Sequence, residues 1–387
     1  MTLFRKKSET NSSLQAEGNK RSFLSRLLTQ TALLVNFFVI AVFLLANAAK
    51  VVSPEQLLLP SYIGLAFPFL ALANCFFLFW WAIRRRWHIV FSLTSILYCF
   101  DSMKETFPIH FGYKEIKGES IKVLTYNVHL FDFYKKKSQN SVLKYLQESD
   151  ADVLCIQEYG FTKKKEYLKE EEISEALSSI YPYCHTDIGD VNATRTFGVA
   201  TFSKYPINSK RKIQFESQHN SAILTEISVN GKAINIINCH LESNKITEND
   251  KELLKQLSSK LDNETAKQTA EHFSQKLGIS YQLRAKQAEA VAKIVENSKD
   301  PIILCGDFND VAVSYTYNTI KGNKLTSAYA RNYCGYGYTF SDKLFPFRID
   351  HILYSKGFKS YNYTIDDVNY SDHYPVYCRI VIGKEEE

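Results

Sequence analysis

The stretch 302–310 reads IILCGDFND and holds the pattern that decides the fold. Residues 302–305 are apolar and predict a buried strand, and Asp307 and Asn309 follow directly after Gly306. A single polar residue at a strand end is usually a turn former. Several such residues from different strands can instead form one site on a rigid scaffold.

The same arrangement recurs through the C-terminal two thirds of the chain, where polar residues stand at the ends of short apolar runs or interrupt them. These residues are Asn127, Glu158, His240, Asp350, His351, Asp372 and His373. The composition and alternation of the runs predict strands at 121–126, 153–156, 198–202, 222–229, 233–239, 302–305, 348–354 and 376–381. Apolar residues at helical spacing predict helices at 139–148, 171–180 and 281–296, and an inserted, charged helical pair at about 244–280.

The N-terminal third has a different composition. Residues 27–49 and 57–83 carry no charge, and 20 helical residues are about enough to cross a bilayer. We expect a basic, disordered tail at 1–26, a membrane region with two or three transmembrane helices at 27–111, and a catalytic domain at 113–387. We also expect this domain to fold without the preceding region.

The third apolar run, 89–100, decides the topology. It is too short to span unless it extends from Trp87 to Phe107. The tail and the three arginines at 84–86 favour the cytoplasmic side, so a spanning third helix places the catalytic domain outside. We expect a bacterial inner-membrane protein with an extracytoplasmic catalytic domain. An interfacial third helix, which would leave the domain in the cytoplasm, remains open.

Charge and cysteine usage disfavour some functions without excluding a nuclease. The chain has a net charge of +6, but the excess lies wholly before residue 120, and the C-terminal part is neutral. This part lacks the basic footprint of tight duplex binding. The eight cysteines form no CxxC pair or zinc spacing, and those at 155, 239, 305 and 378 lie in apolar runs. We interpret these four as buried free thiols.

The motifs TYNVH, IQE, NCHLES, GDFND, RIDHI and SDHYPV resemble those of the endonuclease/exonuclease/phosphatase superfamily, which includes deoxyribonucleases, sphingomyelinases and inositol-polyphosphate phosphatases. The resemblance covers about residues 121–382. It implies an α/β fold (α+β), a four-layer α/β sandwich with two packed mixed β-sheets. The resemblance also implies a Mg²⁺ site between the sheets. In this chain the sandwich follows a transmembrane helical region.

A hard dication prefers oxygen ligands, and Mg²⁺, with Mn²⁺ as the alternative, is the expected cofactor. Glu158 is the first expected ligand, with Asn127 beside it and Asp372 as a second metal-side carboxylate. Asp307 is placed to orient and deprotonate the attacking water. Asn309 is placed to hold that water or a phosphate oxygen.

Two histidines and two arginines complete the expected site. His240 and His373 are suited to donate to the phosphate oxygens, where charge accumulates in the transition state. The resemblance implies that Asp350 orients the imidazole of His373. Arg195 and Arg284 are candidates for binding substrate, although a surface role is as good an interpretation for each.

Three functions compete. The first is a membrane-anchored, Mg²⁺-dependent phosphodiesterase or phosphomonoesterase that acts by in-line attack of water, on a lipid headgroup or a small phosphoester. The second is a membrane-tethered nuclease, although His129 stands where DNA-cutting members often carry an acidic residue. The third is an inactive scaffold, which the intact motifs disfavour. Substrate and bilayer are the expected partners, and no protein partner is indicated.

Overall fold

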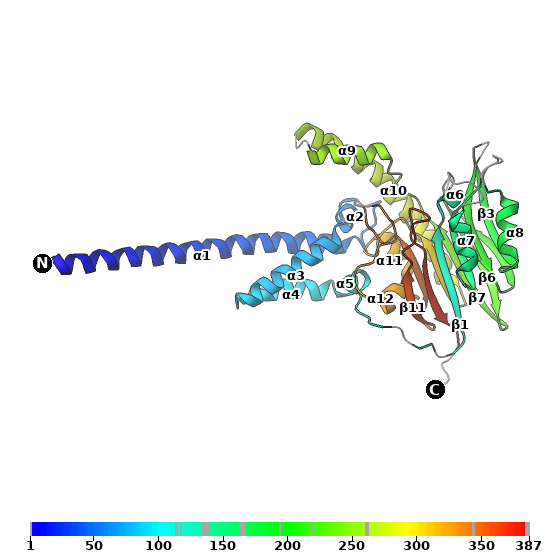
Figure 1. Cartoon of the computed structure of the whole chain (residues 1–387), viewed down its shortest axis with the longest axis horizontal. Coiled ribbons are helices and arrows are strands. Elements are labelled where there is room, and N and C mark those ends of the chain that lie inside the picture. The colour runs from blue at the N-terminus through cyan, green and yellow to red at the C-terminus, as the bar shows by residue number, and fades with distance from the viewer. Residues whose placement is uncertain are drawn as a thin grey trace.

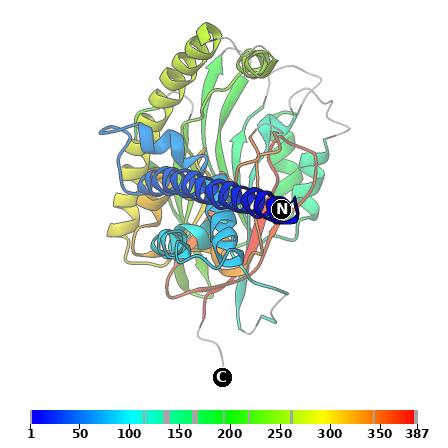
Figure 2. The same cartoon turned by 90° about the vertical axis from the view of Figure 1, so that its left-hand side faces the viewer.

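Two β-sheets packed face to face form the body of the molecule, and a bundle of apolar helices projects from one side of it (Figure 1). The computed structural model describes residues 2–112, 115–116, 118–132, 140–161, 168–192, 195–217, 220–259, 263–342 and 345–383. Figure 2, which looks along the bundle, shows that these helices leave the body at one place.

Both sheets are six-stranded and mixed. The first has the order β11-β12-β1-β2-β4-β3 and the second has the order β5-β6-β7-β8-β10-β9. In the first, β1 and β2 are parallel; in the second, β7 and β8 are parallel; all the other pairs are antiparallel. The strands are β1 Ser120–Asn127, β2 Val153–Tyr159, β3 Tyr183–Asn192, β4 Arg195–Ser203, β5 Ile207–Ile213, β6 Ser221–Val229, β7 Lys232–His240, β8 Ile302–Asp307, β9 Leu325–Ser327, β10 Asp350–Ser355, β11 Lys359–Ile365 and β12 Val376–Val381.

Three apolar clusters hold four layers together. Val123 and Ile236 belong to the cluster between the sheets. Leu146 of α7 packs on the outer face of the first sheet, and Val291 of α10 packs on that of the second. The helices of the body are α6 His129–Asp132, α7 Ser141–Glu148, α8 Glu170–Ser178, α9 Glu248–Ser259, α10 Asn263–Asn297, α11 Tyr315–Lys321 and α12 Ala328–Asn332. The expected four-layer sandwich is confirmed, and Cys155, Cys239, Cys305 and Cys378 are buried free thiols as expected.

Strand register brings the ends of both sheets to one place. In the first sheet Asn127 lies opposite Gln157, the residue before Glu158. In the second, His240 and Asp350 lie opposite Asp307 on its two neighbouring strands. Polar residues far apart in the sequence therefore meet at the carboxyl ends of the parallel pairs.

The N-terminal region forms five helices: α1 Thr2–Ala48, α2 Leu59–Gly64, α3 Phe67–Ile83, α4 Ile89–Tyr98 and α5 Phe100–Thr106. α1 starts at Thr2, so the segment expected to be a disordered tail continues the helix, as propagation from an apolar helix allows. The run at 57–83 is not one helix, because Pro60 and Pro68 each stand in the first turn of a new one.

Two further expectations need correction. The stretch from Trp87 to Phe107 is not one continuous helix, because Cys99 separates α4 from α5 with non-helical φ and ψ of −90° and 13°. The second inserted helix and the predicted helix at 281–296 are one helix, α10, of 35 residues. The insertion therefore extends the body's own helix instead of forming a separate pair.

Buried polar contacts join the helices of the bundle. Asn36 of α1 accepts a hydrogen bond from Trp81 of α3 at 2.8 Å and donates one to Ser92 of α4 at 3.0 Å. Such contacts between apolar helices are typical of membrane bundles. By length and composition one described helix, Ser25–Ala48, is long and apolar enough to cross a membrane, a test that a signal sequence also passes. α3 and α4 are apolar but shorter.

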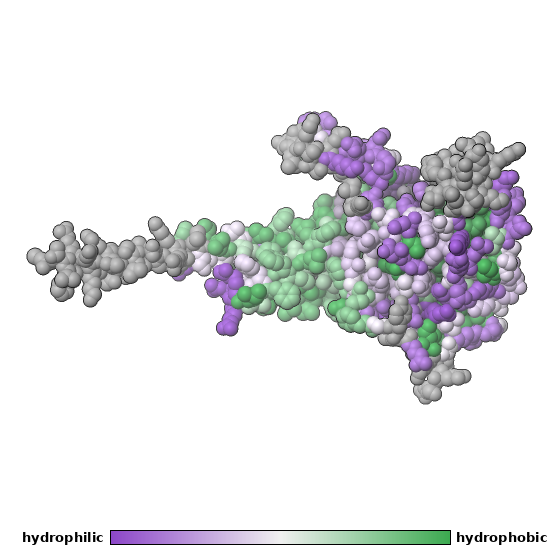
Figure 3. Space-filling view, in the orientation of Figure 1, coloured by the Kyte–Doolittle hydropathy of each residue, from purple (hydrophilic) through white to green (hydrophobic). Residues whose placement is uncertain are grey.

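Exposed apolar side chains concentrate on this bundle. Figure 3 shows a continuous hydrophobic surface along it, whereas the body is mostly polar. Leu34, Phe38, Phe79 and Leu97 are each more than 60% exposed. A surface of this kind marks an interaction site with a membrane or a protein.

The bundle also packs on the body. Tyr62 of α2 donates to the carbonyl of Ser274 of α10 at 2.7 Å. Glu105 of α5 is almost buried and accepts from Tyr317 at 2.8 Å and from Lys321 at 2.7 Å. The two parts thus share an interface with buried polar contacts.

Candidate active site

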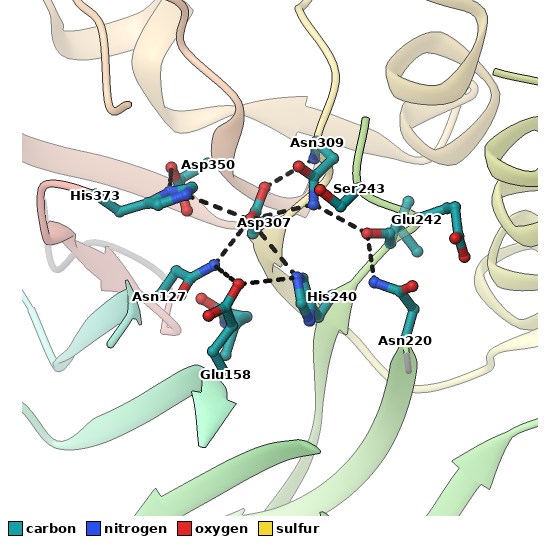
Figure 4. Close-up of polar contacts among 12 residues, drawn as sticks. Asn127, Glu158, Asn220, His240, Glu242, Ser243, Asp307, Asn309, Asp350 and His373 are labelled. Atoms are coloured by element: carbon teal, nitrogen blue, oxygen red, sulfur yellow. Dashed lines mark hydrogen bonds and ion pairs between the residues drawn. The ribbon is translucent and has the colours of Figure 1, made fainter. Parts of the chain in front are cut away.

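Polar side chains from both sheets converge around Asp307 at the end of β8 (Figure 4). Asp307 is 1% exposed. Its Oδ2 accepts a hydrogen bond from Asn127 at 3.0 Å and lies 3.7 Å from Nε2 of His373 and 3.9 Å from Nε2 of His240. The carboxylate is therefore the centre of the cluster.

Glycine is required beside this carboxylate. Gly306 has a φ of +146°, and a Cβ there would lie 2.0 Å from the carbonyl oxygen of Cys239 on β7. The close approach sets His240 directly opposite Asp307. The glycine of GDFND thus sets the spacing of the site.

Glu158 reaches the cluster through an irregularity in its strand. The register of β2 against β4 shifts between Gln157 and Tyr159, and Glu158 has a φ of +49°. A bulge residue in the left-handed region is strained, and bulges often re-aim a side chain next to a site. Glu158 Oε1 lies 3.3 Å from Nδ2 of Asn127 and 3.9 Å from Nε2 of His240.

The carboxyl groups of Glu158 and Asp307 both hold protons more tightly than usual. Burial, together with the nearby Asp372, raises the pKa of Glu158. Burial also raises the pKa of Asp307 to about 6, although His373 opposes the shift. A group with such a pKa can accept a proton near neutral pH.

His373 and Asp350 form a buried pair. His373 Nδ1 lies 2.9 Å from Asp350 Oδ2, and Asp350 is held by the hydroxyl of Thr339, which accepts from its main-chain N–H at 3.1 Å. Burial alone would lower the pKa of His373, but Asp350 and Asp307 outweigh it and raise it well above its ordinary value. The raised pKa favours the protonated form of His373, whose Nε2 lies 3.7 Å from Asp307 Oδ2.

His240 has a different state. It is 2% exposed and packs edge-on against Phe197, with ring centroids 5.5 Å apart. Burial lowers its pKa, although Asp307 opposes the change. The neutral ring offers a hydrogen-bond donor without adding a second positive charge.

The remaining expected residues occupy varied places. Asn309, with a φ of +52°, donates from its main-chain N–H to Asp307 at 2.8 Å and from its amide to the carbonyl of Leu241 at 3.0 Å. It thereby fixes Asp307. Asp372 lies at the rim, with its side chain 47% exposed and 3.8 Å from His129. The side chain of Arg195 lies outside the described residues.

Arg284 does not lie where a substrate phosphate could meet it. It is fully buried, and its guanidinium donates to the carbonyl of Glu242 at 2.7 Å and to Asn244 at 2.8 Å. It also pairs with Asp310 at 3.3 Å. We therefore correct its role from substrate binding to positioning of the loops that follow β7 and β8.

Two further pairs of residues position the site through contacts that the sequence did not predict. Gln157 donates to Asn238 at 2.7 Å between the sheets, so the Q of IQE and the N of NCH act together. Arg348 lies 2.7 Å from Nδ1 of His351, whose Nε2 lies 2.9 Å from the carbonyl of Asp310. His351 thus joins Arg348 to the segment that follows β8. Burial lowers the pKa of His351 well below its ordinary value. A polar residue within an apolar strand was the only available signal for Gln157 and Asn238.

The donor set fits a hard dication. Glu158 and Asp307 bring carboxylates to the two sides of Asn127, and Asp350 Oδ1 is buried without a hydrogen-bond partner in the described part of the chain. Asp307, Asp350 and His373 also bring possible ligand atoms within 4.8 Å of one another, but the hydrogen bond from His373 to Asp350 and the raised pKa of His373 favour a proton there, which leaves the metal to the side of Glu158. Nδ2 of Asn127 faces Glu158 and Asp307, while its oxygen accepts from the N–H of His129 at 3.1 Å, so this amide must turn over before its oxygen can face a metal beside Glu158.

Comparison with known proteins agrees with this geometry. The Endonuclease/Exonuclease/phosphatase family matches residues 124–373, and a domain of unknown function (DUF8431) matches residues 26–106. No curated protein matches the chain significantly. The chain belongs to the endonuclease/exonuclease/phosphatase family and is one of its metal-dependent phosphoester hydrolases.

Among solved structures similar to this chain, one reaches a TM-score of 0.50. An endonuclease/exonuclease/phosphatase from Beutenbergia cavernae has a TM-score of 0.50 at 14% identity, over 69% of this chain and 72% of that one. Sphingomyelinase C from Streptomyces griseocarneus has a TM-score of 0.47 at 17% identity, over 67% and 99%. The human Nocturnin catalytic domain has a TM-score of 0.46 at 16% identity, over 70% and 96%.

Proposed function

We propose that this chain is a membrane-anchored, Mg²⁺-dependent hydrolase that cleaves a phosphodiester or phosphomonoester by in-line attack of water on phosphorus. The observation that carries the proposal is the convergence of Asn127, Glu158, His240 and His373 on Asp307 from four other segments of the sandwich. Positioning and electrostatic stabilisation are what phosphoryl transfer requires of a protein.

The metal would be held by Glu158, by Asn127 after its amide turns over, and by Asp372 at the rim. Bound there, it would polarise the phosphate and neutralise developing charge. The proximity of Asp372 to Glu158, which raises the pKa of Glu158, supports this assignment, because a dication relieves the repulsion between two carboxylates.

The proton transfer falls to Asp307. With a pKa of about 6, its carboxylate is largely ionised at neutral pH and can accept the proton of the attacking water. Asn309 holds it in place through the main-chain N–H at 2.8 Å.

His373 and His240 act on the phosphate oxygens. His373, kept protonated by Asp350, supplies a charged donor, and charge-assisted hydrogen bonds are the stronger kind. Neutral His240 supplies a second donor from the opposite side of Asp307. Both interactions grow stronger as negative charge accumulates on the phosphate.

We further propose that the bundle spans the membrane and carries the body outside the cytoplasm. α3 leads away from the body, the three arginines at 84–86 lie at the remote end, and α4 and α5 return (Figure 1). Under the positive-inside rule, that remote end is cytoplasmic. Phe67, where α3 begins, and Cys99, where α4 ends, share an apolar cluster with Val313, so these two helices meet the body at the ends away from the arginines.

The substrate is tested with the full-length protein in detergent. Plasmid DNA, RNA, sphingomyelin and phosphoinositides are each incubated with Mg²⁺ or with a chelator, alongside His373→Ala. We expect Mg²⁺-dependent hydrolysis of one phosphoester class, lost in the variant. Cleavage of plasmid or RNA alone would support the tethered nuclease instead. Hydrolysis that persists with the chelator and in His373→Ala would contradict the proposed function.

A further inference from the structure

A polar groove lies where the bundle meets the body, and it shares no residue with the catalytic cluster. It is a groove of about 590 Å³ formed by the ends of α1 and α5 together with α11, β9 and α12. Five cationic side chains line it against two carboxylates. The cations are Lys50, Lys104, Lys321, Arg331 and Lys356.

Most of this positive charge has no partner. Glu105 is engaged by Lys321 at 2.7 Å and by Tyr317, which leaves Asp101 as the other carboxylate. Within the described residues, no carboxylate lies within 4 Å of Lys50 or Lys104, or of Arg331 and Lys356. Unpaired cations around one hollow attract an anion and repel one another without it.

The groove continues into the apolar surface of the bundle. Val51 lines it and is 67% exposed. Phe100, 53% exposed, lies under the ammonium group of Lys104 at 5.7 Å. Figure 3 shows the hydrophobic surface ending where the body begins. An occupant would therefore meet cations on one side and hydrocarbon on the other.

We infer that this groove binds the phosphate headgroup of an anionic phospholipid in the leaflet next to the body. The inference rests on the proposed membrane anchoring. A headgroup phosphate fits unpaired lysines and an arginine, and its acyl chains fit the exposed apolar side chains beside them. A nucleic acid would not use the apolar side of the groove.

The test is native mass spectrometry of the full-length protein in mild detergent, with phosphatidylglycerol or phosphatidylcholine added. The variant is Lys50→Gln/Lys104→Gln/Lys356→Gln. The matched control, Lys232→Gln/Lys293→Gln/Lys299→Gln, removes three exposed lysines of the body. At low ionic strength we expect about fivefold weaker phosphatidylglycerol binding per lysine, and roughly 100-fold for the triple variant.

Wild type and control should retain phosphatidylglycerol, and phosphatidylcholine binding should be weak in all three. Sodium phosphate should displace the lipid no better than sodium chloride at equal ionic strength. Equal binding by variant and control, equal retention of both lipids, or selective displacement by phosphate would overturn the inference.

Two further measurements, one on the purified protein and one on membranes of the expressing cells, separate this inference from the proposed function. Hydrolysis of bis(p-nitrophenyl) phosphate reports the catalytic site, and resistance to alkaline carbonate extraction reports the anchoring. If the wild-type protein resists extraction and hydrolyses the substrate but shows no preference for phosphatidylglycerol, only the inference about the groove is overturned. Release by carbonate overturns the anchoring and the groove together.

Discussion

His373 and Asp350 are joined by a hydrogen bond of 2.9 Å between Nδ1 and Oδ2, which leaves Nε2 of His373 facing Asp307. The pair comes from two different sheets, since Asp350 begins β10 and His373 precedes β12. The charge on His373 thus depends on a partner that the sandwich itself brings to it.

The first prediction concerns pH. The pKa of His373 is raised, so its protonated form persists above the ordinary value and activity is lost as pH rises through the raised pKa. Asp350→Asn removes the main source of that shift, so the alkaline limb of the pH–rate profile should move to lower pH. The exposed Asp300→Asn serves as control and should not move it. An unchanged alkaline limb in Asp350→Asn would show that Asp350 does not set this pKa.

The same pair predicts non-additive losses. If Asp350 acts by orienting and charging His373, Asp350→Asn should cost little once His373→Ala has been made. The measurement is kcat/KM for both single variants and the double variant. Losses that multiply would mean that the two residues act independently.

Gly306 predicts a stability effect. A Cβ would lie 2.0 Å from the carbonyl oxygen of Cys239, so Gly306→Ala should lower the free energy of unfolding by about 2–4 kcal/mol. Gly231→Ala is the matched control: it also has a positive φ, of +79°, but open space, and should cost about 1 kcal/mol. Chemical denaturation measures the free energy of unfolding of both variants. Equal losses of that free energy would show that the close approach of Gly306 to Cys239 does not cause the destabilisation.

The interface between bundle and body predicts the behaviour of fragments. Glu105 accepts from Tyr317 at 2.8 Å, and its carbonyl accepts from Arg348 at 2.8 Å. A fragment of residues 113–387 loses these contacts and exposes Val313, which packs against the bundle. It should melt several degrees below a fragment of residues 99–387, which keeps α5. Equal melting temperatures would favour the simpler expectation that the domain is independent.

Topology gives a further prediction. Alkaline phosphatase fused after Gly112 should be active, because the bundle would bring this point outside the cytoplasm. A fluorescent protein that folds only in the cytoplasm, fused at the same place, should stay dark. The reverse result would place the catalytic body in the cytoplasm.

The sequence predicted the interior of both sheets and missed their edges. The eight predicted strands correspond to the eight inner strands, whereas β3, β5, β9 and β11 are the four edge strands. Inner strands are covered on both faces by the neighbouring layers, so they appear as apolar runs. An edge strand such as β5, INSKRKI, is mostly exposed and therefore mostly polar, so it has no apolar run by which the sequence could predict it.

The site was predictable in part for a similar reason. Residues that end apolar strands, such as Asp307 and His240, could be found by position. The bulge that turns Glu158 inward and the burial of Arg284 depend on contacts across the fold, for which the sequence carries no local signal. The link from Arg348 through His351 to Asp310 likewise exists only after β10 has paired with β8.

Metal binding tests the central claim most directly. Mn²⁺ added to the full-length protein is followed by electron paramagnetic resonance, with Mg²⁺ as competitor and Glu252→Gln as an exposed control. We expect wild type and control to bind Mn²⁺ and release it to Mg²⁺. Glu158→Gln should bind at least about 10–100-fold more weakly, which is the loss caused by removing an outer-shell partner alone, with a matching loss of hydrolysis. Unchanged Mn²⁺ affinity and unchanged Mg²⁺ dependence in Glu158→Gln would contradict a metal-dependent site built on this residue.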